Sequence, residues 1–429
     1  INIKFYHFKC IKICYRIHTI FMGGKMKILK YFVVISTFFL STISYAGTLV
    51  INSNQSDPRA NEVMHAYIKA FDEAHPDITV VVNDFDTEEY KVSLRNFLQA
   101  DPPDIAIWFA GNRMKFFVDQ GLFEDVSDVW ESAGFNDSMS ATKGALTVDG
   151  KQYGVPYGYY QWGVYYRKDI FDDLGLNEPR TWDEFKWVCA MLKKNGVTPI
   201  SIGTRYLWTA AGWFDYMNMR VNGYDFHMDL MNGDASYEDP RLDDVFDKWA
   251  ELLNAGYFLE DHAALSWQEA ITPMINGEAA MYLMGNFMVP FFEDAGMVDK
   301  VDYFQFPKIY EGIGMAEDAP TDTFHIPSGA KNKEDARKFL AFLANPEEAY
   351  KLASGNGVLT PNGNAKAPED RFQKQGFKVL SNASDIAQFY DRDTHPDMHA
   401  DGMPGLQEFM VKPDRIGAIR SRLDKTRKR

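Results

Sequence analysis

Apolar and polar positions follow one another along the chain in patterns that predict alternating strands and helices. An apolar run at residues 49–51 predicts a strand, and the helically spaced apolar residues after Pro58 predict a helix. The runs ITVVVN at 78–83 and PPDIAIWF at 102–109 predict two further strands. Strand, helix and strand in this order are typical of an α/β fold with a mostly parallel sheet flanked by helices.

The most clearly marked helix begins after Thr181. Thr181 and Glu184 have the spacing of a capping box, and Gly196 ends the helical pattern. Cys189 lies on the apolar face of this helix. We therefore interpret Cys189 as a small core residue and not as a nucleophile.

Further amphipathic helices are predicted at residues 240–256 and 332–357, and a strand is predicted at 279–285. No internal repeat or low-complexity linker separates these segments. The domains should therefore be joined by short crossing segments. The best candidates are VPYGYYQWG at 155–163 and PTDTFHIPSG at 320–329.

The first 46 residues differ from the rest, because they carry seven Lys or Arg and no acid. Residues 26–46 have the basic start, short apolar run and small residues of a secretory signal peptide, with cleavage expected after Ala46. We interpret residues 1–25 as translated upstream sequence. Gly47 stands where a lipid-anchored protein would have cysteine, so we expect a periplasmic protein that is not lipid-anchored.

Removal of the signal segment leaves 383 residues, with 38 basic and 60 acidic side chains and a net charge of −22. Such a charge disfavours binding to nucleic acid or to anionic lipid. Cys189 is then the only cysteine, so no internal disulfide is expected, and the length is sufficient for two domains. The sequence has no Walker loop, HExxH, CxxC or GxSxG motif, and we predict no cofactor.

The segment YDRDTHPDMHADG at 390–402 alternates acids and histidines, which raises the question of a metal site. A calcium loop would need glycine where Pro396 stands and glutamate where Gly402 stands, and Pro396 also disfavours a helical zinc pair. We predict no metal. We expect Asp391 and Arg392 to hydrogen-bond a polar ligand, with a solvated acidic turn as the alternative.

Tryptophans are the most prominent candidates for ligand contact. Trp108 lies at the C-terminal end of a predicted strand, where open α/β sheets hold their ligands. Trp208 and Trp213 follow the apolar segment 198–203 in a similar place, and Trp267 is a further candidate. We interpret the tryptophans of the predicted helices as structural residues: Trp182, Trp187 and Trp249.

An aromatic stretch, YGVPYGYYQWGVYYRKD at 153–169, holds six tyrosines and one tryptophan. Side chains alternate between faces along a strand, so the stretch cannot direct all its rings to one place. We expect only the part nearest the crossing, Tyr160 and Trp162, to reach a ligand. The same alternation argues against iron binding by the pair Tyr165 and Tyr166.

Residues 150–185, which contain this stretch, resemble the central signature of the maltose-binding-protein-like family of extracellular solute-binding proteins of ABC importers. Three further segments match in family order, at 103–126, 267–287 and 320–349. The runs WTAAGWFDYMNMRVNGYDFHMDL and QFYDRDT are similar to a branch of the family that binds sugars.

The resemblance implies a two-lobed periplasmic binding protein fold, with a ligand cleft between two α/β lobes. It implies residues 47–158 plus 324–357 for the N-terminal lobe, and 159–323 plus 358–429 for the C-terminal lobe. It also implies a receptor and not an enzyme. Such a receptor is expected to be a monomer and to deliver its ligand to an inner-membrane permease whose ATPase is a separate polypeptide.

Site residues carry over from the family one position at a time. Trp108 matches a stacking tryptophan, Tyr160 matches a ligand-contacting position beyond the crossing, and Trp208 lies near a second aromatic position. Where many members have Gly-x-Trp, this chain has Gly285, Asn286 and Phe287, which argues against a maltodextrin. We still expect Asn286 and Phe287 to contact the ligand. The cleft-lining segments correspond to residues 54–59, with Asn54 and Asp57, and to 391–393, with Asp391 and Arg392.

Stacking aromatics combined with acids, amides and arginine suit a carbohydrate, because a pyranose has an apolar face and a ring of hydroxyls. We therefore expect a mono- or oligosaccharide ligand. A polyamine or another small polar solute is the alternative, because acids and aromatics also suit a cation. A secreted glycosidase or lyase would share these residues but would need two carboxylates at a fixed separation.

Overall fold

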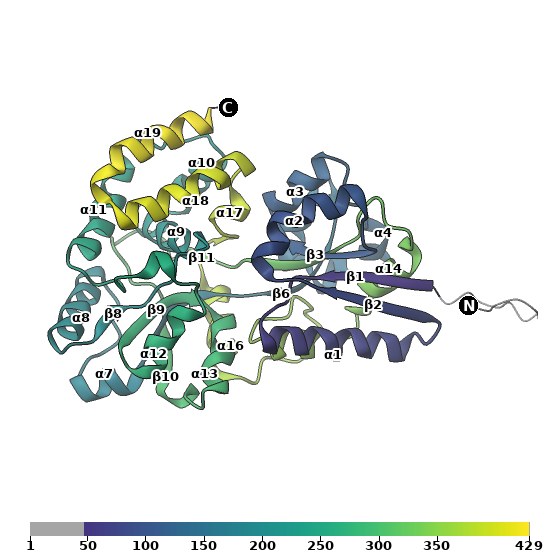
Figure 1. Cartoon of the computed structure of the whole chain (residues 1–429), viewed down its shortest axis with the longest axis horizontal. Coiled ribbons are helices and arrows are strands. Elements are labelled where there is room, and N and C mark those ends of the chain that lie inside the picture. The colour runs from purple at the N-terminus through teal and green to yellow at the C-terminus, as the bar shows by residue number, and fades with distance from the viewer. Residues whose placement is uncertain (1–46, 429) are drawn as a thin grey trace, which may run out of the picture. The chain divides into compact units, whose positions relative to one another are not determined.

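The computed structural model describes residues 47–428, which lie in one compact unit, Gly47–Arg429 (Figure 1). The predicted signal peptide and the segment 1–25 lie outside the described residues. No helix of the described part is long and apolar enough to cross a membrane.

A five-stranded sheet with strand order β2-β1-β3-β12-β6 organises one half of this unit, the first lobe. Its strands are β1 (Gly47–Ser53), β2 (Ile78–Asp84), β3 (Ile105–Phe109), β12 (Thr321–His325) and β6 (Val155–Tyr159). Its helices are α1 (Pro58–Ala74), α2 (Thr87–Ala100), α3 (Asn112–Asp119), α4 (Ser127–Ser132), α5 (Phe135–Ser138), α6 (Ser140–Lys143), α14 (Lys333–Phe342) and α15 (Pro346–Gly355). The short strands β4 (Thr147–Val148) and β5 (Lys151–Gln152) form a separate pair.

A four-stranded sheet with strand order β10-β7-β9-β8 organises the second lobe. Its strands are β7 (Trp162–Arg167), β8 (Thr198–Ile200), β9 (Ala279–Gly285) and β10 (Val301–Phe304), and β11 (Glu317–Asp318) pairs separately with β13 (Ile386–Ala387). Its helices are α7 (Lys168–Leu174), α8 (Trp182–Lys194), α9 (Trp208–Asn222), α10 (Tyr224–Met231), α11 (Arg241–Asn254), α12 (Thr272–Asn276), α13 (Val289–Asp294), α16 (Arg371–Asn382), α17 (Tyr390–Asp393), α18 (Pro396–Val411) and α19 (Ile416–Arg427).

Both sheets are mixed, which corrects the expectation of mostly parallel sheets. In the first sheet β12 runs antiparallel to β3 and β6, whereas β1 pairs in parallel with β2 and β3. In the second sheet β7 runs antiparallel to β9 and β10, whereas β8 and β9 are parallel. The reversed strands are β12 in the first sheet and β7 in the second. Each is the strand by which the chain enters from the other lobe, and this entry sets its direction.

Local signals account for the best-predicted elements. Pro58 begins α1 directly after Asp57, as its fixed backbone angle favours. The capping box at α8 is present, because the Thr181 hydroxyl accepts from the Glu184 amide at 3.3 Å and the Glu184 carboxylate accepts from the Thr181 amide at 3.1 Å. Losing such a cap costs about 1 kcal/mol.

Two large groups of buried apolar residues fill the lobes. The residues of the first group come from two segments, Leu49 to Tyr157 and Phe324 to Leu352. Those of the second group come from Tyr160 to Phe306 and from Ala353 to Leu423. Each fully buried large side chain contributes about 1.5–3 kcal/mol. Cys189 is buried in the second group, where burial raises the pKa of its thiol, so it is a core residue as predicted. The residue boundaries implied for the two lobes stay a prediction.

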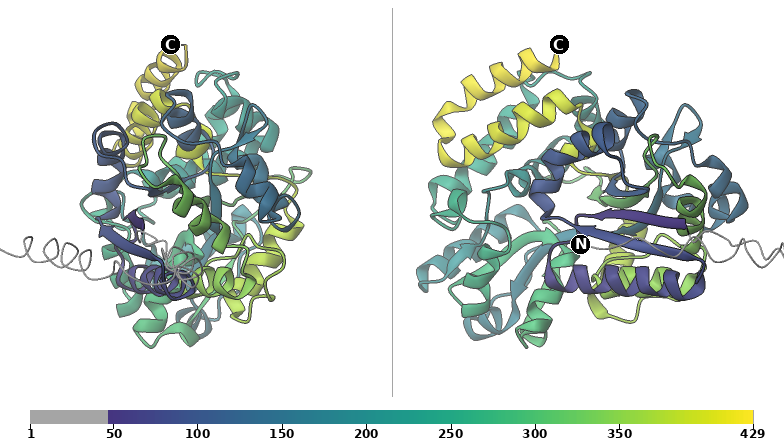
Figure 2. Two further views of the ribbon diagram at one scale, coloured as in Figure 1. Left: turned by 90° about the vertical axis from the view of Figure 1, so that its right-hand side faces the viewer. Right: turned by 45° about the vertical axis from the view of Figure 1, so that its right-hand side comes forward.

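The C-terminal helices hold one wall of the cleft in place. Helices α18 and α19 lie side by side, and α18 packs on α9 and α17 (Figures 1 and 2). The short helix α17 also contacts α3 of the first lobe. Its first amide, that of Tyr390, donates to the buried carboxylate of Asp215 at 2.7 Å. These contacts fix the segment that carries Asp391 and Arg392.

Candidate functional site

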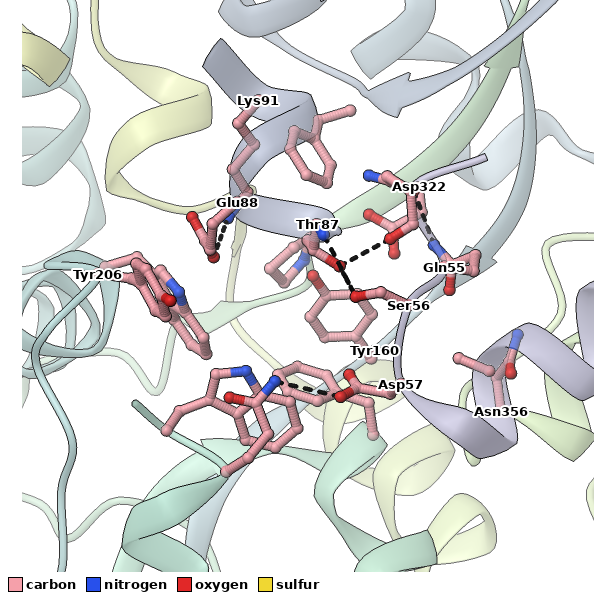
Figure 3. Close-up of a pocket in the computed structure, with 18 of the residues that line it drawn as sticks. Gln55, Ser56, Asp57, Thr87, Glu88, Lys91, Tyr160, Tyr206, Asp322 and Asn356 are labelled. Carbon is pink, nitrogen blue, oxygen red and sulfur yellow. Dashed lines mark hydrogen bonds and ion pairs between the residues drawn. The ribbon is translucent and has the colours of Figure 1, made fainter. Parts of the chain in front are cut away.

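A cleft of about 440 Å³ is lined by residues of both lobes, within the range of about 300–1,000 Å³ usual for small-molecule sites. The first lobe contributes the loop after β1, the first turn of α2 and the end of β3, and the second contributes the start of α9 and the turn after β9. Figure 3 shows side chains of the loop after β1 and of α2 around the same space as Tyr160 and Tyr206. The ends of strands therefore build the cleft, as in other open α/β sheets.

Nine of the twelve residues predicted to bind ligand line this cleft: Asn54, Asp57, Tyr160, Trp162, Trp208, Trp267, Phe287, Asp391 and Arg392. They come from positions more than 300 residues apart in the chain. The structure does not bring the other three, Trp108, Trp213 and Asn286, into the lining.

Trp108 lies behind the lining because neighbours on a strand point to opposite faces. The residue is 2% exposed, and its ring packs against Tyr90 and Phe117 and donates its indole N–H to the Arg113 carbonyl at 3.2 Å. Phe109, the next residue on β3, lines the cleft instead. This placement corrects the expectation that Trp108 forms the stacking surface.

Trp213 and Asn286 are both fully buried. Trp213 packs edge-on against Phe258 and Phe306, with ring centroids 4.9 and 5.6 Å away, and it belongs to a helix whose residues 209–221 are all buried. Asn286 lies in the tight turn after β9, and its successor Phe287 reaches the cleft in its place.

Five side chains form an aromatic wall on the second lobe: Tyr160, Trp162, Trp208, Trp267 and Phe287. Phe287 is its central member, with centroids 4.9 Å from Tyr160 and 5.2 Å from Trp267, both edge-on. Trp208 lies edge-on to Trp162 and Trp267 at 5.9 and 6.1 Å. Such pairs each contribute about 0.5–1.5 kcal/mol beyond burial, so the wall is a pre-formed surface.

Two glycines make room for this wall. A Cβ on Gly285 would lie 2.7 Å or less from two atoms of the Phe287 ring, so the ring can fold back only over glycine. A Cβ on Gly212 of α9 would lie 2.9 Å from the Trp162 ring and 3.3 Å from Phe389. The Gly-Asn-Phe sequence after β9 and the glycine within α9 therefore have a packing function.

A strained turn positions Trp208. Leu207 has a φ of 70°, which is rare for a residue with a branched side chain, and the Trp208 amide donates to the Tyr206 carbonyl at 2.8 Å. A hydrogen bond from residue i+2 to residue i, with a positive φ at the residue between them, defines the less common, classic γ-turn. Such strain costs about 1–3 kcal/mol and concentrates at functional sites. Here it places Tyr206 and Trp208 in the lining at the start of α9.

Charged side chains in the lining have partners within the protein. Glu88 pairs with Lys91 at 2.8 Å, and Glu269 pairs with Arg205 at 3.0 Å. Asp86 accepts from two backbone amides at the start of α2. Each of these groups enters the cleft with its charge compensated.

Asp391 pairs with Arg113 at 2.9 Å, and both side chains are about 12% exposed. Burial alone would raise the pKa of Asp391, but nearby positive charge, above all Arg113, lowers it below its ordinary value. The opposite holds for Asp57, whose pKa burial raises against the effect of a hydrogen bond from Gln268. Asp391 therefore stays ionised, and Asp57 takes up a proton more readily.

The lobes contact each other across the cleft. The Gln268 amide donates to Asp57 at 3.1 Å, and Arg59 at the start of α1 contacts Glu293 at 3.4 Å and also Asp294 at the end of α13. Lys91 lies 6.0 Å from the centre of the Trp208 ring. These contacts need the two lobes to be close together.

Several lining residues were not predicted: Phe109, Lys91, Gln268, Asp322 and Asn356. Asn356 is buried, and its Oδ1 has no hydrogen-bond partner among the described residues. Asp322 lies within the crossing segment 320–329, which was the only sequence signal for it. Phe109 and Gln268 lie in the family-matched segments 103–126 and 267–287, but no pattern singled out either side chain. Lys91 and Asn356 had no such signal, because their place in the lining depends on tertiary packing.

The acidic segment 390–402 forms α17 and the start of α18. His395 caps α18 by accepting from the Asp397 amide at 3.3 Å, and His399 contacts Arg113 at 2.9 Å. Among residues 47–428, no group of three or more His, Cys, Asp or Glu is placed to hold a metal ion.

Comparison with known proteins adds to this geometry. The sequence model of bacterial extracellular solute-binding proteins matches residues 56–350. An uncharacterised ABC-transporter extracellular-binding protein of Pyrococcus horikoshii is 30% identical over 330 residues, 75% of this chain and 74% of that protein. The multiple sugar-binding protein of Streptococcus mutans is 23% identical over 332 residues, 71% of this chain and 76% of that protein.

A solved structure is similar over nearly its whole length. It is the bacterial solute receptor AcbH, described as having an exclusive substrate preference for β-D-galactopyranose. It superposes with a TM-score of 0.85 at 30% identity, covering 89% of this chain and 99% of that chain.

Proposed function

The chain belongs to the bacterial extracellular solute-binding proteins, and from this premise we propose that its cleft captures a neutral carbohydrate, a mono- or oligosaccharide. It is the solute-binding protein of an ABC transporter. Membership of this family confirms the expectation of a receptor and not of a secreted glycosidase or lyase. The expected periplasmic-binding-protein fold is likewise confirmed.

The composition of the cleft lining is the observation that carries the proposal. The aromatic wall of the second lobe and polar side chains of the first lobe line one space. A pyranose has an apolar C–H face for such a wall and hydroxyls for carboxylates, amides and arginine. Relatives named as receptors for sugars support the same assignment.

The pairing of charges favours a neutral sugar over a polyamine. Of the six carboxylates in the lining, four already pair with Lys or Arg: Glu88, Glu269, Asp322 and Asp391. A polyamine would bring two or more positive charges and would compete with these cations. A neutral ligand leaves the pairs intact and hydrogen-bonds to their free positions.

We further propose the transport context expected from the sequence. The receptor acts as a monomer in the periplasm and has no lipid anchor. Its signal peptide, residues 26–46, is removed by cleavage after Ala46. It delivers its ligand to an inner-membrane permease with a separate ATPase. The N-terminal lobe comprises 47–158 and 324–357, and the C-terminal lobe comprises 159–323 and 358–429.

A thermal-shift screen tests the proposed ligand class. The panel contains D-galactose, D-glucose, D-xylose, lactose, raffinose and chitobiose, with putrescine and spermidine as the competing class. A ligand at 100 times its Kd stabilises the folded protein by about 2.7 kcal/mol, so a true ligand raises Tm measurably. We expect a sugar to do so. A response to a polyamine and to none of the sugars would contradict the proposal.

A further inference from the structure

Asp322 lies at the cleft edge of the first sheet, in β12, which is paired with β3 on one side and with β6 on the other. It is opposite Phe109 of β3 and opposite Gly158 of β6, and the pairing of β12 with β6 shifts register between Asp322 and Thr323. Irregularities of this kind re-aim side chains and are frequent near functional sites. The Asp322 side chain is 22% exposed and lines the cleft.

Arg392 of α17 holds Asp322 in place. Its side chain is 7% exposed, and its guanidinium donates to the Thr321 carbonyl at 2.8 Å and to Asp322 Oδ1 at 3.1 Å. The same nitrogen that binds Asp322, Nη2, also donates to the Tyr160 hydroxyl at 2.8 Å. A planar guanidinium with fixed donor directions orients both partners. Because one nitrogen binds both oxygens, Tyr160 and Asp322 must lie close together.

Each of the two partners retains one free hydrogen-bonding function. Arginine only donates, so the Tyr160 oxygen accepts from Arg392 and its own O–H proton remains available. Asp322 uses Oδ1 for Arg392, and its Oδ2 has no partner among the described residues. The cleft thus has one donor and one acceptor side by side. The donor, Tyr160, is itself part of the aromatic wall, with its ring centroid 4.9 Å from that of Phe287.

We propose that Asp322 and Tyr160, oriented by Arg392, form a donor–acceptor pair that binds one hydroxyl group of the ligand. This inference rests on the proposed function, because a sugar hydroxyl donates and accepts at once. The hydroxyl donates to Asp322 Oδ2 and accepts from the Tyr160 O–H. Arg392 is a positioning residue, whereas Asp322 and Tyr160 determine specificity. A ligand that lacks this hydroxyl leaves both groups unpaired and should bind roughly tenfold to a hundredfold more weakly.

The test uses calorimetry with the panel sugar that binds the wild type most tightly and with its monodeoxy analogues. The variants are Asp322→Asn and Tyr160→Phe. The matched controls are Asp302→Asn, whose side chain is also 22% exposed and pairs with Arg371 at 3.2 Å, and Tyr166→Phe, whose hydroxyl binds Glu178 away from the cleft. Melting temperatures verify that each variant is folded, and Tyr160→Phe is the gentler change should Asp322→Asn not fold.

We expect the wild type to discriminate against one deoxy position by at least about tenfold. Both variants should weaken binding of the parent sugar, and both should reduce discrimination at that same position, whereas the controls should do neither. Unchanged affinity in both folded variants, or relaxation at different positions, would overturn the pair while leaving sugar binding intact. Binding of polyamines and of no sugar would instead overturn the proposed function, and the inference with it.

Discussion

The contacts of Arg59 predict that closure of the lobes depends on an ion pair at the exposed edge of the cleft. Arg59 at the start of α1 reaches Glu293 at 3.4 Å and also Asp294 at the end of α13, and we call these contacts the edge latch. The latch joins the two lobes, so it exists only when they are close. Arg59→Ala should therefore favour the open form and weaken sugar binding.

The size of this effect follows from solvent exposure. The Arg59 side chain is 37% exposed, and the side chains of Glu293 and Asp294 are 38% and 58% exposed. Exposed ion pairs contribute about 0.2–1 kcal/mol, and one guanidinium shared by two carboxylates stays near the upper end of that range. Since 1.4 kcal/mol corresponds to a factor of ten, Kd should rise about two- to fivefold, mainly through faster dissociation.

Titration calorimetry and stopped-flow dissociation at low and high salt measure this effect. Salt screens exposed charges, because the Debye length falls from about 10 Å at 0.1 M to about 3 Å at 1 M, so the loss should shrink at high salt. A double-mutant cycle with Asp294→Ala should be non-additive. Lys186→Ala is the control, because Lys186 pairs with Glu251 at 3.0 Å within the second lobe.

Two results would refute the edge latch. One is an unchanged Kd for Arg59→Ala at low salt. The other is a loss that persists at high salt and adds to that of Asp294→Ala, which would mean that Arg59 contacts the sugar directly.

Three shorter predictions follow from the same structure. Phe109→Leu should weaken sugar binding about two- to tenfold in calorimetry, whereas Trp108→Phe should stay within about twofold, because only Phe109 lines the cleft; the reverse order would contradict this placement. Leu207→Gly removes the strain of the positive φ at this position, so Tm should stay nearly unchanged. Sugar binding should weaken, because the turn no longer fixes Trp208. An unchanged affinity would argue against a role for the strain. Burial, with the like charge of Asp391, raises the pKa of Asp393 from 3.8 to about 6. The folded protein therefore keeps this proton at a pH where the unfolded chain has lost it, so the free energy of unfolding falls as pH rises from about 4 through 6. In urea denaturation, Asp393→Asn should therefore gain about 1–3 kcal/mol relative to wild type between pH 4 and 7, and a constant difference would refute the assignment.

Features encoded by neighbouring residues could be predicted from the sequence. The capping box of α8 and the start of α1 at Pro58 depend on residues within one turn, and the structure has both. Tyr160 and Trp162 were placed near the cleft by their distance from the crossing, and both line it.

The orientation of the third strand could not be predicted. Every residue of β3 is buried, so its sequence IAIWF has no polar side to distinguish one face from the other. The choice between Trp108 and Phe109 therefore depended on tertiary packing. In β1 the alternation is partly visible, but it too gives way to a fully buried end.

Asp322 and its partner Arg392 illustrate a second limit. The two residues are 70 positions apart, and they meet because β12 enters the first sheet while α17 is held by the second lobe. A register shift beside Asp322 then sets its direction. No local pattern encodes such a meeting, so the paired charges that favour a neutral ligand became visible only in three dimensions.

The most direct test of the account is a calorimetric titration of the purified protein with the panel sugars, followed by chromatography of the recovered ligand. We predict saturable binding of one sugar per protein, and we predict that the sugar is recovered intact. Saturable binding of a polyamine with no response to any sugar would contradict the assignment of a carbohydrate receptor, as would release of new reducing ends.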